Sequence, residues 1–353
     1  MKRTIVAIRR HAGQVVALAL ACLMLVSVEA GVRRINPRSL MRYEESVDAY
    51  RIVRQTLDTE GAPDICFVGS SRCRDGVVMP VVAKACWPAT VGNFSLPGAT
   101  ALVVRLSVRR IVNADPKPRL ILYGVTPRQL RAYIPEQIGG GVEGLVGPGD
   151  LPMLAMTPDA SAHDMFEATL RNGISSRVRA ISFRDGLKAR VFRPETKQRP
   201  YHMHGALSAA QVPKKQPRLC DNPYTPERAR TYVYPDGGED NRVYVDSQLT
   251  HIEGIMHLCA DAGVPLVLFE IPSSAMLERA LPEGMLVQAT EKIAAVAEKK
   301  GVRFVRLSDM GLAFTEADFR DISHLNNTGA RRLTDALLES VILPLTSRAI
   351  LVE

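Results

Sequence analysis

The sequence is poor in aromatic residues and in paired cysteines. Phe, Trp and Tyr together make up 5% of the 353 residues. Proteins that bind single-stranded nucleic acid use aromatic side chains as stacking platforms, so this scarcity argues against that class. Six cysteines occur, but no two are spaced as CxxC, which argues against a structural zinc site. Cys73 and Cys86 are near enough in sequence for a disulfide, although spacing alone does not establish one.

Outside the N-terminal segment, positive and negative charges nearly cancel. The chain carries a formal net charge of +8, but residues 1–42 hold eight Lys or Arg residues and one Glu, so the other 311 residues carry about +1. A nearly neutral body lacks the basic surface expected of a nucleic-acid-binding protein, and we expect no nucleic acid as a partner. Basic flanks around an apolar run point to a membrane instead.

Long hydrophobic runs are absent except at residues 15–28. A membrane-spanning helix needs about 20 residues, which this run reaches only with its flanks. The basic start, the short apolar stretch and the sequence Val28-Glu-Ala before Gly31 also fit a cleavable secretory signal. A retained anchor and a cleaved signal both remain open for residues 1–32. Either one predicts a cell-envelope protein, periplasmic or extracytoplasmic, and the first predicts anchoring by one N-terminal transmembrane helix.

The rest of the chain alternates short apolar runs with amphipathic helical patterns. Such alternation predicts right-handed βαβ units and a parallel sheet that is covered on both faces. We therefore expect a three-layer α/β/α flavodoxin-like sandwich with a five-stranded parallel sheet. The expected strands are residues 65–68, 90–96, 120–124, 266–271 and 302–307, and the expected helices are 44–57, 77–87 (interrupted at Pro80), 99–113, 243–262, 288–300 and 328–341.

The regular alternation stops after the third strand. Residues 127–242 contain several glycine- and proline-rich stretches and only fragments of helical pattern. A structureless loop of this length is uncommon inside a domain, so we interpret the segment as an insertion or cap beside the sheet. The two parts of the main domain are then residues 33–126 and 243–353.

A serine pair follows the first expected strand directly, in Gly69-Ser70-Ser71. Open α/β sheets bind ligands at the carboxyl ends of their strands, so a serine here is either a helix N-cap or a nucleophile. Asp321 and His324, about 250 residues later, favour the nucleophile. At positions i and i+3 the carboxylate can hold the imidazole by Nδ1 and leave Nε2 free to take the serine proton. We predict Ser71 as nucleophile, His324 as base and Asp321 as its orienting carboxylate.

Other candidate residues fit a site less well. Arg72 and Arg74 flank the expected crevice, and we interpret them as solvated surface residues, with attraction of an anionic substrate as the alternative. His202 and His204 lie close together and could suggest a metal, but no carboxylate pattern is nearby, so we interpret them as part of a surface insertion. We expect His251 and His257 to be structural, and we expect neither a metal nor a cofactor.

These motifs resemble the sequence blocks of the SGNH (GDSL-type) hydrolase superfamily. Gly69-Ser70-Ser71 resembles the Gly-Asp-Ser block. Residues 93–100 (NFSLPGAT) resemble the second block, whose glycine donates a backbone N–H to the oxyanion and corresponds to Gly98. Asp321-Ile-Ser-His324, followed by LNNTGA, resembles the last block.

The resemblance covers roughly residues 62–126 and 243–345. The Gly-Ser-Ser and His-Leu-Asn forms are more similar to a membrane-associated subgroup, which includes the alginate O-acetylation proteins and the D-alanine transfer protein of teichoic acids. One block departs: where the family has Gly-x-Asn-Asp, this chain has Gly124-Val-Thr-Pro-Arg128. The implied oxyanion hole comprises the N–H groups of Ser71 and Gly98, with Thr126 in place of the asparagine or Arg128 contributing.

The resemblance implies a cell-envelope serine esterase or O-acyltransferase that acts on acyl groups of a surface polysaccharide. Its substrate would be an acylated glycan or another ester, and a membrane-bound O-acyltransferase would be its donor partner. Losing one oxyanion donor costs about 10²- to 10³-fold in rate in other enzymes. The missing asparagine therefore motivates an alternative, a catalytically weak glycan-binding or scaffold protein of a polysaccharide assembly complex.

Overall fold

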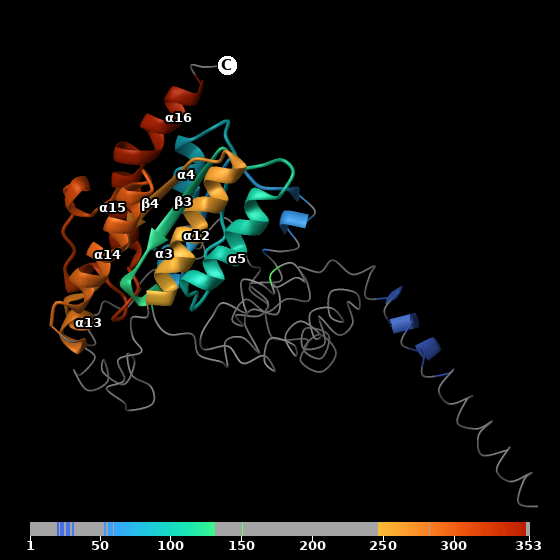
Figure 1. Ribbon diagram of the computed structural model, residues 1–353, viewed down its shortest axis with the longest axis horizontal. Coiled ribbons are helices and arrows are strands. Elements are labelled where there is room, and N and C mark those ends of the chain that lie inside the picture. Colours follow the sequence, from blue (N-terminus) through green and yellow to red (C-terminus); the bar gives the residue numbers. More distant parts are fainter. Residues whose placement is uncertain are drawn as a thin grey trace, which may run out of the picture.

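The structure is a computed structural model that describes most of the two segments expected to form the main domain (Figure 1). Apart from residues 127–130 and 150, the expected insertion lies outside the described residues, as does most of the expected helix 44–57. The described residues are 60–130, 150, 246–281 and 283–350, with separate helical positions at 20, 22–24, 26–28, 30–31, 53 and 56–58.

A five-stranded parallel sheet forms the middle layer, in the order β2-β1-β3-β4-β5. This is the strand order of a flavodoxin-like doubly wound sheet, and it confirms the predicted fold class. In such sheets the switch point lies between β1 and β3, which is where ligands bind. The strands are β1 Ile65–Gly69, β2 Val91–Asn93, β3 Leu120–Val125, β4 Leu266–Glu270 and β5 Arg303–Val305.

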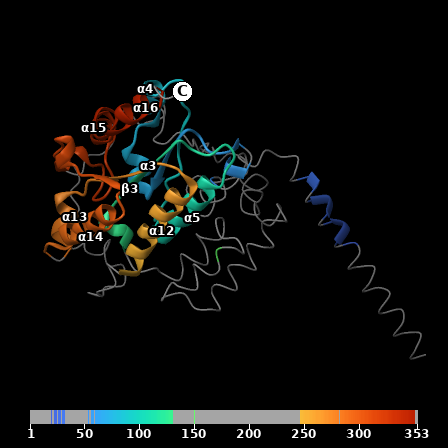
Figure 2. The same ribbon diagram turned by 45° about the horizontal axis from the view of Figure 1, so that its top comes forward.

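Alternate residues of the strands pack into two separate cores, one on each face. Cys66, Val68 and Tyr123 lie in the core beneath α5, α12 and α14, whereas Phe67 and Leu122 lie in the core beneath α3, α4 and α15. Figures 1 and 2 show α5 and α12 side by side on one face. Each fully buried large apolar side chain contributes about 1.5–3 kcal/mol to folding. The helices are α3 Ser71–Gly76, α4 Met79–Ala85, α5 Ala101–Val112, α12 Asp246–Ala262, α13 Ala275–Ala280, α14 Met285–Lys299, α15 Asn327–Leu337 and α16 Leu343–Ile350.

The outer strands are shorter than the apolar runs predicted. The Asn93 side chain accepts a hydrogen bond from the backbone N–H of Ser95 (3.0 Å), a local contact that competes with the ladder and ends β2. The chain nevertheless stays beside β1, because Leu96 donates to the carbonyl of Gly69 (2.9 Å). The loop after β2 is thereby held against the carboxyl end of β1, two residues before Ser71.

Several helices differ from their predictions. α3 and α13 were not predicted, because each has only six residues. Pro80 does not interrupt α4 but lies in its first turn, where a missing N–H costs nothing. The closing helix continues beyond residue 341 through a π-helical turn, Leu338–Ile342, into α16.

Two glycines let α3 pack directly on the sheet. A Cβ on Gly124 would lie 2.6 Å from the Cys73 sulfur, and one on Gly69 would lie 2.7 Å from the Cys73 Cβ. No side chain fits at either position without moving the helix. Gly69, the last residue of β1, and Gly124, next to last in β3, therefore set the position of Ser71, which begins α3.

The expected membrane segment lies largely outside the described residues. Its described positions are helical, and their large apolar side chains are exposed. No helix in the described part of the chain is long and apolar enough to span a bilayer.

Candidate active site

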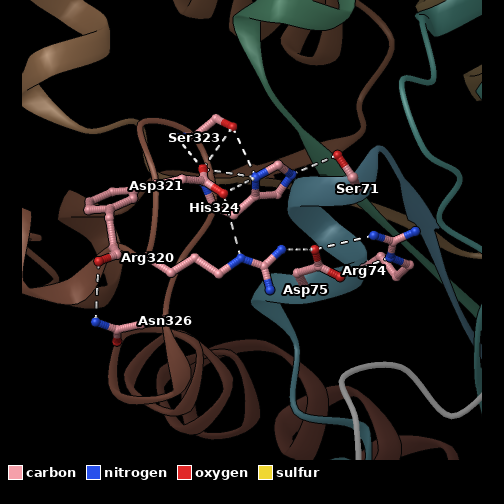
Figure 3. A network of polar contacts seen from close by, with 9 residues as sticks. Ser71, Arg74, Asp75, Arg320, Asp321, Ser323, His324 and Asn326 are labelled. Atoms are coloured by element: carbon pink, nitrogen blue, oxygen red, sulfur yellow. Dashed lines mark hydrogen bonds and ion pairs between the residues drawn. The ribbon is translucent and has the colours of Figure 1, made fainter. Parts of the chain in front are cut away.

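Ser71 begins the helix that follows β1, at the switch point of the sheet. The N-cap of α3 is Ser70, whose backbone is extended and whose side chain makes no capping hydrogen bond. The interpretation of Ser71 as an N-cap is therefore wrong. Its hydroxyl Oγ instead lies 2.9 Å from Nε2 of His324 (Figure 3).

His324 lies between Ser71 and Asp321. Its Nδ1 is 3.0 Å from each carboxylate oxygen of Asp321. One of these oxygens also accepts the backbone N–H groups of Ser323 and His324, at 2.8 Å each. Figure 3 shows the imidazole with one nitrogen toward the serine and the other toward the carboxylate. The structure thus brings together the three residues predicted from the sequence.

The loop that carries Asp321 and His324 is closed by backbone contacts at both ends. The Arg320 N–H donates to the carbonyl of His324 (3.0 Å), and Phe319 pairs with Leu325. Because the turn is closed in this way, the spacing of three residues places carboxylate and imidazole on the same side. A D-x-x-H sequence in an open loop would lack this restraint.

Asp321 is charged at neutral pH. Burial by itself raises the pKa of this carboxyl, but the hydrogen bond and charge of His324 and the two backbone N–H groups outweigh burial, so the pKa lies well below its ordinary value. A carboxylate beside Nδ1 assigns the imidazole proton to that nitrogen. Nε2 is then the acceptor that faces the Ser71 hydroxyl.

Ser323 is part of the same hydrogen-bond network, and the sequence reasoning missed it. Its buried hydroxyl lies 3.2 Å from an oxygen of Asp321 and 3.0 Å from Nδ1 of His324. A serine between two motif residues carries no pattern of its own. Its role follows only from the turn that folds the side chain back.

A chain of ion pairs connects α3 to the histidine loop. Asp75 pairs with Arg74 (2.8 Å) and with Arg320 (2.5 Å), and Nε of Arg320 lies 3.6 Å from Asp321. Burial raises the pKa of Asp75, but the charges of Arg74 and Arg320 outweigh it and lower the pKa. The interpretation of Arg74 as a solvated surface residue is corrected, because its guanidinium is engaged by Asp75.

Arg72 is also not a solvated surface residue. Its side chain is buried, and Nη1 lies 3.3 Å from the hydroxyl of Ser273 in the loop after β4. The next residue, Ser274, donates to the carbonyl of Ile322 (2.7 Å) in the histidine loop. The loops after β1 and β4 and the histidine loop are therefore tied together around the site.

The two further residues predicted for the oxyanion hole lie at the same edge of the sheet. Gly98 has φ +66°, a conformation that favours glycine, in the loop that follows β2. Thr126 directly follows β3 and is buried. Its N–H donates to Oε1 of Gln129 (3.1 Å), so its hydroxyl, which has no hydrogen-bond partner among the described residues, is the group left to act.

Gln129 is a second residue that the sequence reasoning missed. It lies in the 3₁₀ turn η2 Pro127–Leu130, and its buried Nε2 has no hydrogen-bond partner in the described part of the chain. The side-chain amide is oriented by the Thr126 N–H. The sequence does contain one signal for it: Gln129 is a side-chain amide shortly after the third strand, where the resembled family has an asparagine. The Arg128 side chain lies outside the described residues.

The remaining candidates lie apart from this site. His251 is buried against Arg105, at 3.3 Å, and burial, followed by the charge of Arg105, lowers its pKa to about 4. His257 contacts Lys300 (3.0 Å) at the surface. Among the described residues, no three His, Cys, Asp or Glu side chains are grouped to bind a metal ion. His202 and His204 lie outside these residues, and Cys73 and Cys86 are both free thiols.

Comparison with known proteins adds no relative. No family model matches the chain, and no curated protein matches its sequence.

Proposed function

We propose that this protein is a cell-envelope serine esterase or O-acyltransferase of the SGNH type, acting on acyl groups of a surface polysaccharide. The observation that carries the proposal is the 2.9 Å contact between Ser71 Oγ and His324 Nε2, with Asp321 at Nδ1. Nucleophile, base and orienting carboxylate in this order define nucleophilic acyl transfer.

The geometry supports a two-step reaction. Ser71 Oγ attacks the acyl carbonyl while His324 Nε2 takes its proton, and the ester C–O bond then breaks as that proton passes to the leaving alcohol. Water or a sugar hydroxyl next attacks the acyl-serine and gives its proton to His324. The bond between the acyl carbon and Ser71 Oγ then breaks, and His324 returns the proton to Oγ. Asp321 stabilises the protonated imidazole throughout. Hydrolysis and transfer differ only in the acceptor of the second step.

The oxyanion would be stabilised by donors from three strand ends. The N–H groups of Ser71 and Gly98 and the hydroxyl of Thr126 follow β1, β2 and β3, respectively. Such donors act best when they are fixed before the reaction and shielded from water. The Gln129 amide, adjacent to Thr126, is the remaining candidate for the role of the missing asparagine.

The SGNH assignment is supported by the positions of the motifs in the fold. The serine block follows β1, the Gly98 block follows β2, and the histidine block precedes α15, around the switch point of a flavodoxin-like sheet. Exposed apolar positions in the helical N-terminal segment support an anchor in the envelope. A membrane-bound O-acyltransferase as donor partner remains part of the proposal on resemblance alone.

A catalytically weak glycan-binding or scaffold protein is the second candidate. One observation favours it: the Thr126 N–H is occupied by Gln129, and no asparagine amide follows β3. With too few donors in the oxyanion hole, Ser71 and His324 would still be in contact, but acyl transfer would be slow.

Labelling with a fluorophosphonate and hydrolysis of p-nitrophenyl acetate test the proposal on the full chain. We expect labelling of Ser71, and loss of both signals in Ser71→Ala and His324→Ala. Ser70→Ala is the matched control, because the Ser70 side chain makes no capping hydrogen bond, and it should keep both signals. Equal rates in all four folded proteins, without labelling, would favour the scaffold.

A further inference from the structure

A cavity lies at the amino edge of the sheet, opposite the candidate active site. It measures about 400 Å³ and is open to solvent. Its floor includes Ile65 and Leu120, the first residues of β1 and β3. Its walls come from the loop after α4, which carries Trp87, and from the first turn of α16, which carries Leu343 and Leu345. None of the residues that line it belongs to the proposed catalytic machinery.

The polar groups of this cavity are largely engaged within the protein. The Asp64 carboxylate accepts hydrogen bonds from the N–H and the hydroxyl of Thr90, both at 2.7 Å. The Thr346 hydroxyl donates to the carbonyl of Ile342 (2.9 Å). A ligand here would therefore meet mainly apolar surface, and apolar cavities favour apolar occupants over water.

The rim of the cavity exposes large apolar side chains. Trp87, the only tryptophan of the chain, is 83% exposed, and Leu343 is 37% exposed. An indole so placed gains by entering a membrane interface, where its ring lies among the headgroups and its N–H stays hydrated. Two charged residues, Arg119 and Asp64, line the same cavity, and Lys84 is exposed on α4, the helix that precedes Trp87.

We propose that this cavity docks the domain on the bilayer by accepting an acyl chain of a membrane lipid. Trp87 and Leu343 enter the interface, where the exposed Lys84 on α4 meets the headgroups. The N-terminal segment supplies a second, independent reason for a membrane: it is basic and apolar, and one of its two predicted roles is a retained anchor. The chain that follows it enters the domain at this edge, because Ile65 begins β1 and lines the cavity.

Docking in this way orients the candidate active site. Ser71 lies six residues beyond Ile65, at the other end of β1, which at about 3.3 Å per residue is roughly 20 Å from the cavity floor. The carboxyl edge would face away from the bilayer. A hydrophilic polymer would then reach Ser71 from the aqueous side, without competing with lipid.

The single tryptophan makes the proposal directly measurable on the full chain. The protein is reconstituted into vesicles of phosphatidylcholine and phosphatidylglycerol in equal parts, with or without bromine on the acyl chains. We expect Trp87 emission to shift to shorter wavelength in vesicles and to lose most of its intensity to the brominated chains. A water-like emission without bromine quenching, in protein that floats with the vesicles, would overturn the proposal.

Two variants separate the cavity from general adsorption. Leu345→Asp places a charge in the cavity wall and should abolish the quenching. Val287→Asp is the matched control, because Val287 is 65% exposed on α14 and does not line this cavity. Should Leu345→Asp not fold, the wild-type quenching decides alone. Quenching by free brominated fatty acid, with none from brominated vesicles, would also overturn docking on the bilayer.

Discussion

The guanidinium of Arg320 lies 2.5 Å from the carboxylate of Asp75, although 245 residues separate them in the sequence. This ion pair joins the helix that begins with Ser71 to the loop that ends with His324. Asp75 is held from its other side by Arg74. The contact between Ser71 and His324 therefore depends on the Asp75–Arg320 ion pair, which lies one turn of α3 beyond Ser71.

Replacing Arg320 with Gln should loosen that connection. A misplacement of about 1 Å costs about 10²-fold in rate, so we expect kcat for p-nitrophenyl acetate to fall about ten- to a hundredfold. Stability should fall by about 1.5–3 kcal/mol, because a hydrogen bond to a buried charge is lost. Arg320→Lys should restore part of the rate, since it keeps the charge but not the two-sided donation.

Arg331→Gln provides the matched control for this prediction. Arg331 pairs with Asp335 on the exposed face of α15, with side chains 56% and 44% exposed. Such surface pairs contribute about 0.3–0.5 kcal/mol. If Arg331→Gln and Arg320→Gln had equal effects on rate, the Asp75–Arg320 pair would have no role in positioning the site.

Stability should decrease at acid pH through Asp75 and Asp321. The pKa of each carboxyl is lower in the folded protein than its ordinary value, so the unfolded chain binds protons more readily as pH falls. Their contribution is fully present above the ordinary carboxyl pKa of about 4 and is lost as pH decreases below it. Urea unfolding of Asp75→Asn should show a shallower loss of stability with acid than the wild type. An unchanged slope would contradict this assignment.

The Thr126 hydroxyl should matter more than its methyl group. Removal of one oxyanion donor costs about 10²- to 10³-fold, so we expect Thr126→Val to lower kcat by that amount with little change in KM. Thr126→Ser keeps the hydroxyl and should keep most of the activity. If Thr126→Val were fully active, the donor would be sought in the Gln129 amide, by measuring Gln129→Leu.

A side chain at Gly124 should displace α3 and with it Ser71. The added Cβ would lie 2.6 Å from the sulfur of Cys73, and overpacking of this kind costs about 1–3 kcal/mol. We expect Gly124→Ala to lower both the free energy of unfolding and the esterase rate. Adding Cys73→Ala removes the clashing sulfur and should recover part of both, as a double-mutant cycle would show.

Gly76→Ala is the control for this helix. Its added Cβ would meet Leu333 at 3.6 Å, which is an ordinary contact, so we expect stability and rate close to those of the wild type. A stable and fully active Gly124→Ala protein would contradict the view that the glycine sets the position of the helix.

The sequence by itself determined the features that are encoded locally. Short apolar runs ending in glycine identify buried parallel strands, and both the Gly-Ser-Ser and the D-x-x-H patterns are complete within a few residues. The fold class and the three residues Ser71, Asp321 and His324 could be predicted for this reason. The short helix α3 was missed, because six residues are too few for a helical period to show.

Only the tertiary structure decided which distant groups meet. Arg72 and Arg74 resemble surface residues in sequence, yet one is buried toward Ser273 and the other is paired with Asp75. The pairing of Asp75 with Arg320 has no sequence signal, because the two residues are 245 positions apart and neither local sequence identifies the other as its partner. Packing of α3 and the histidine loop on one sheet largely buries the Asp75 carboxylate. Only a cation that the fold brings within reach, here Arg320, can then offset the cost of burying that charge.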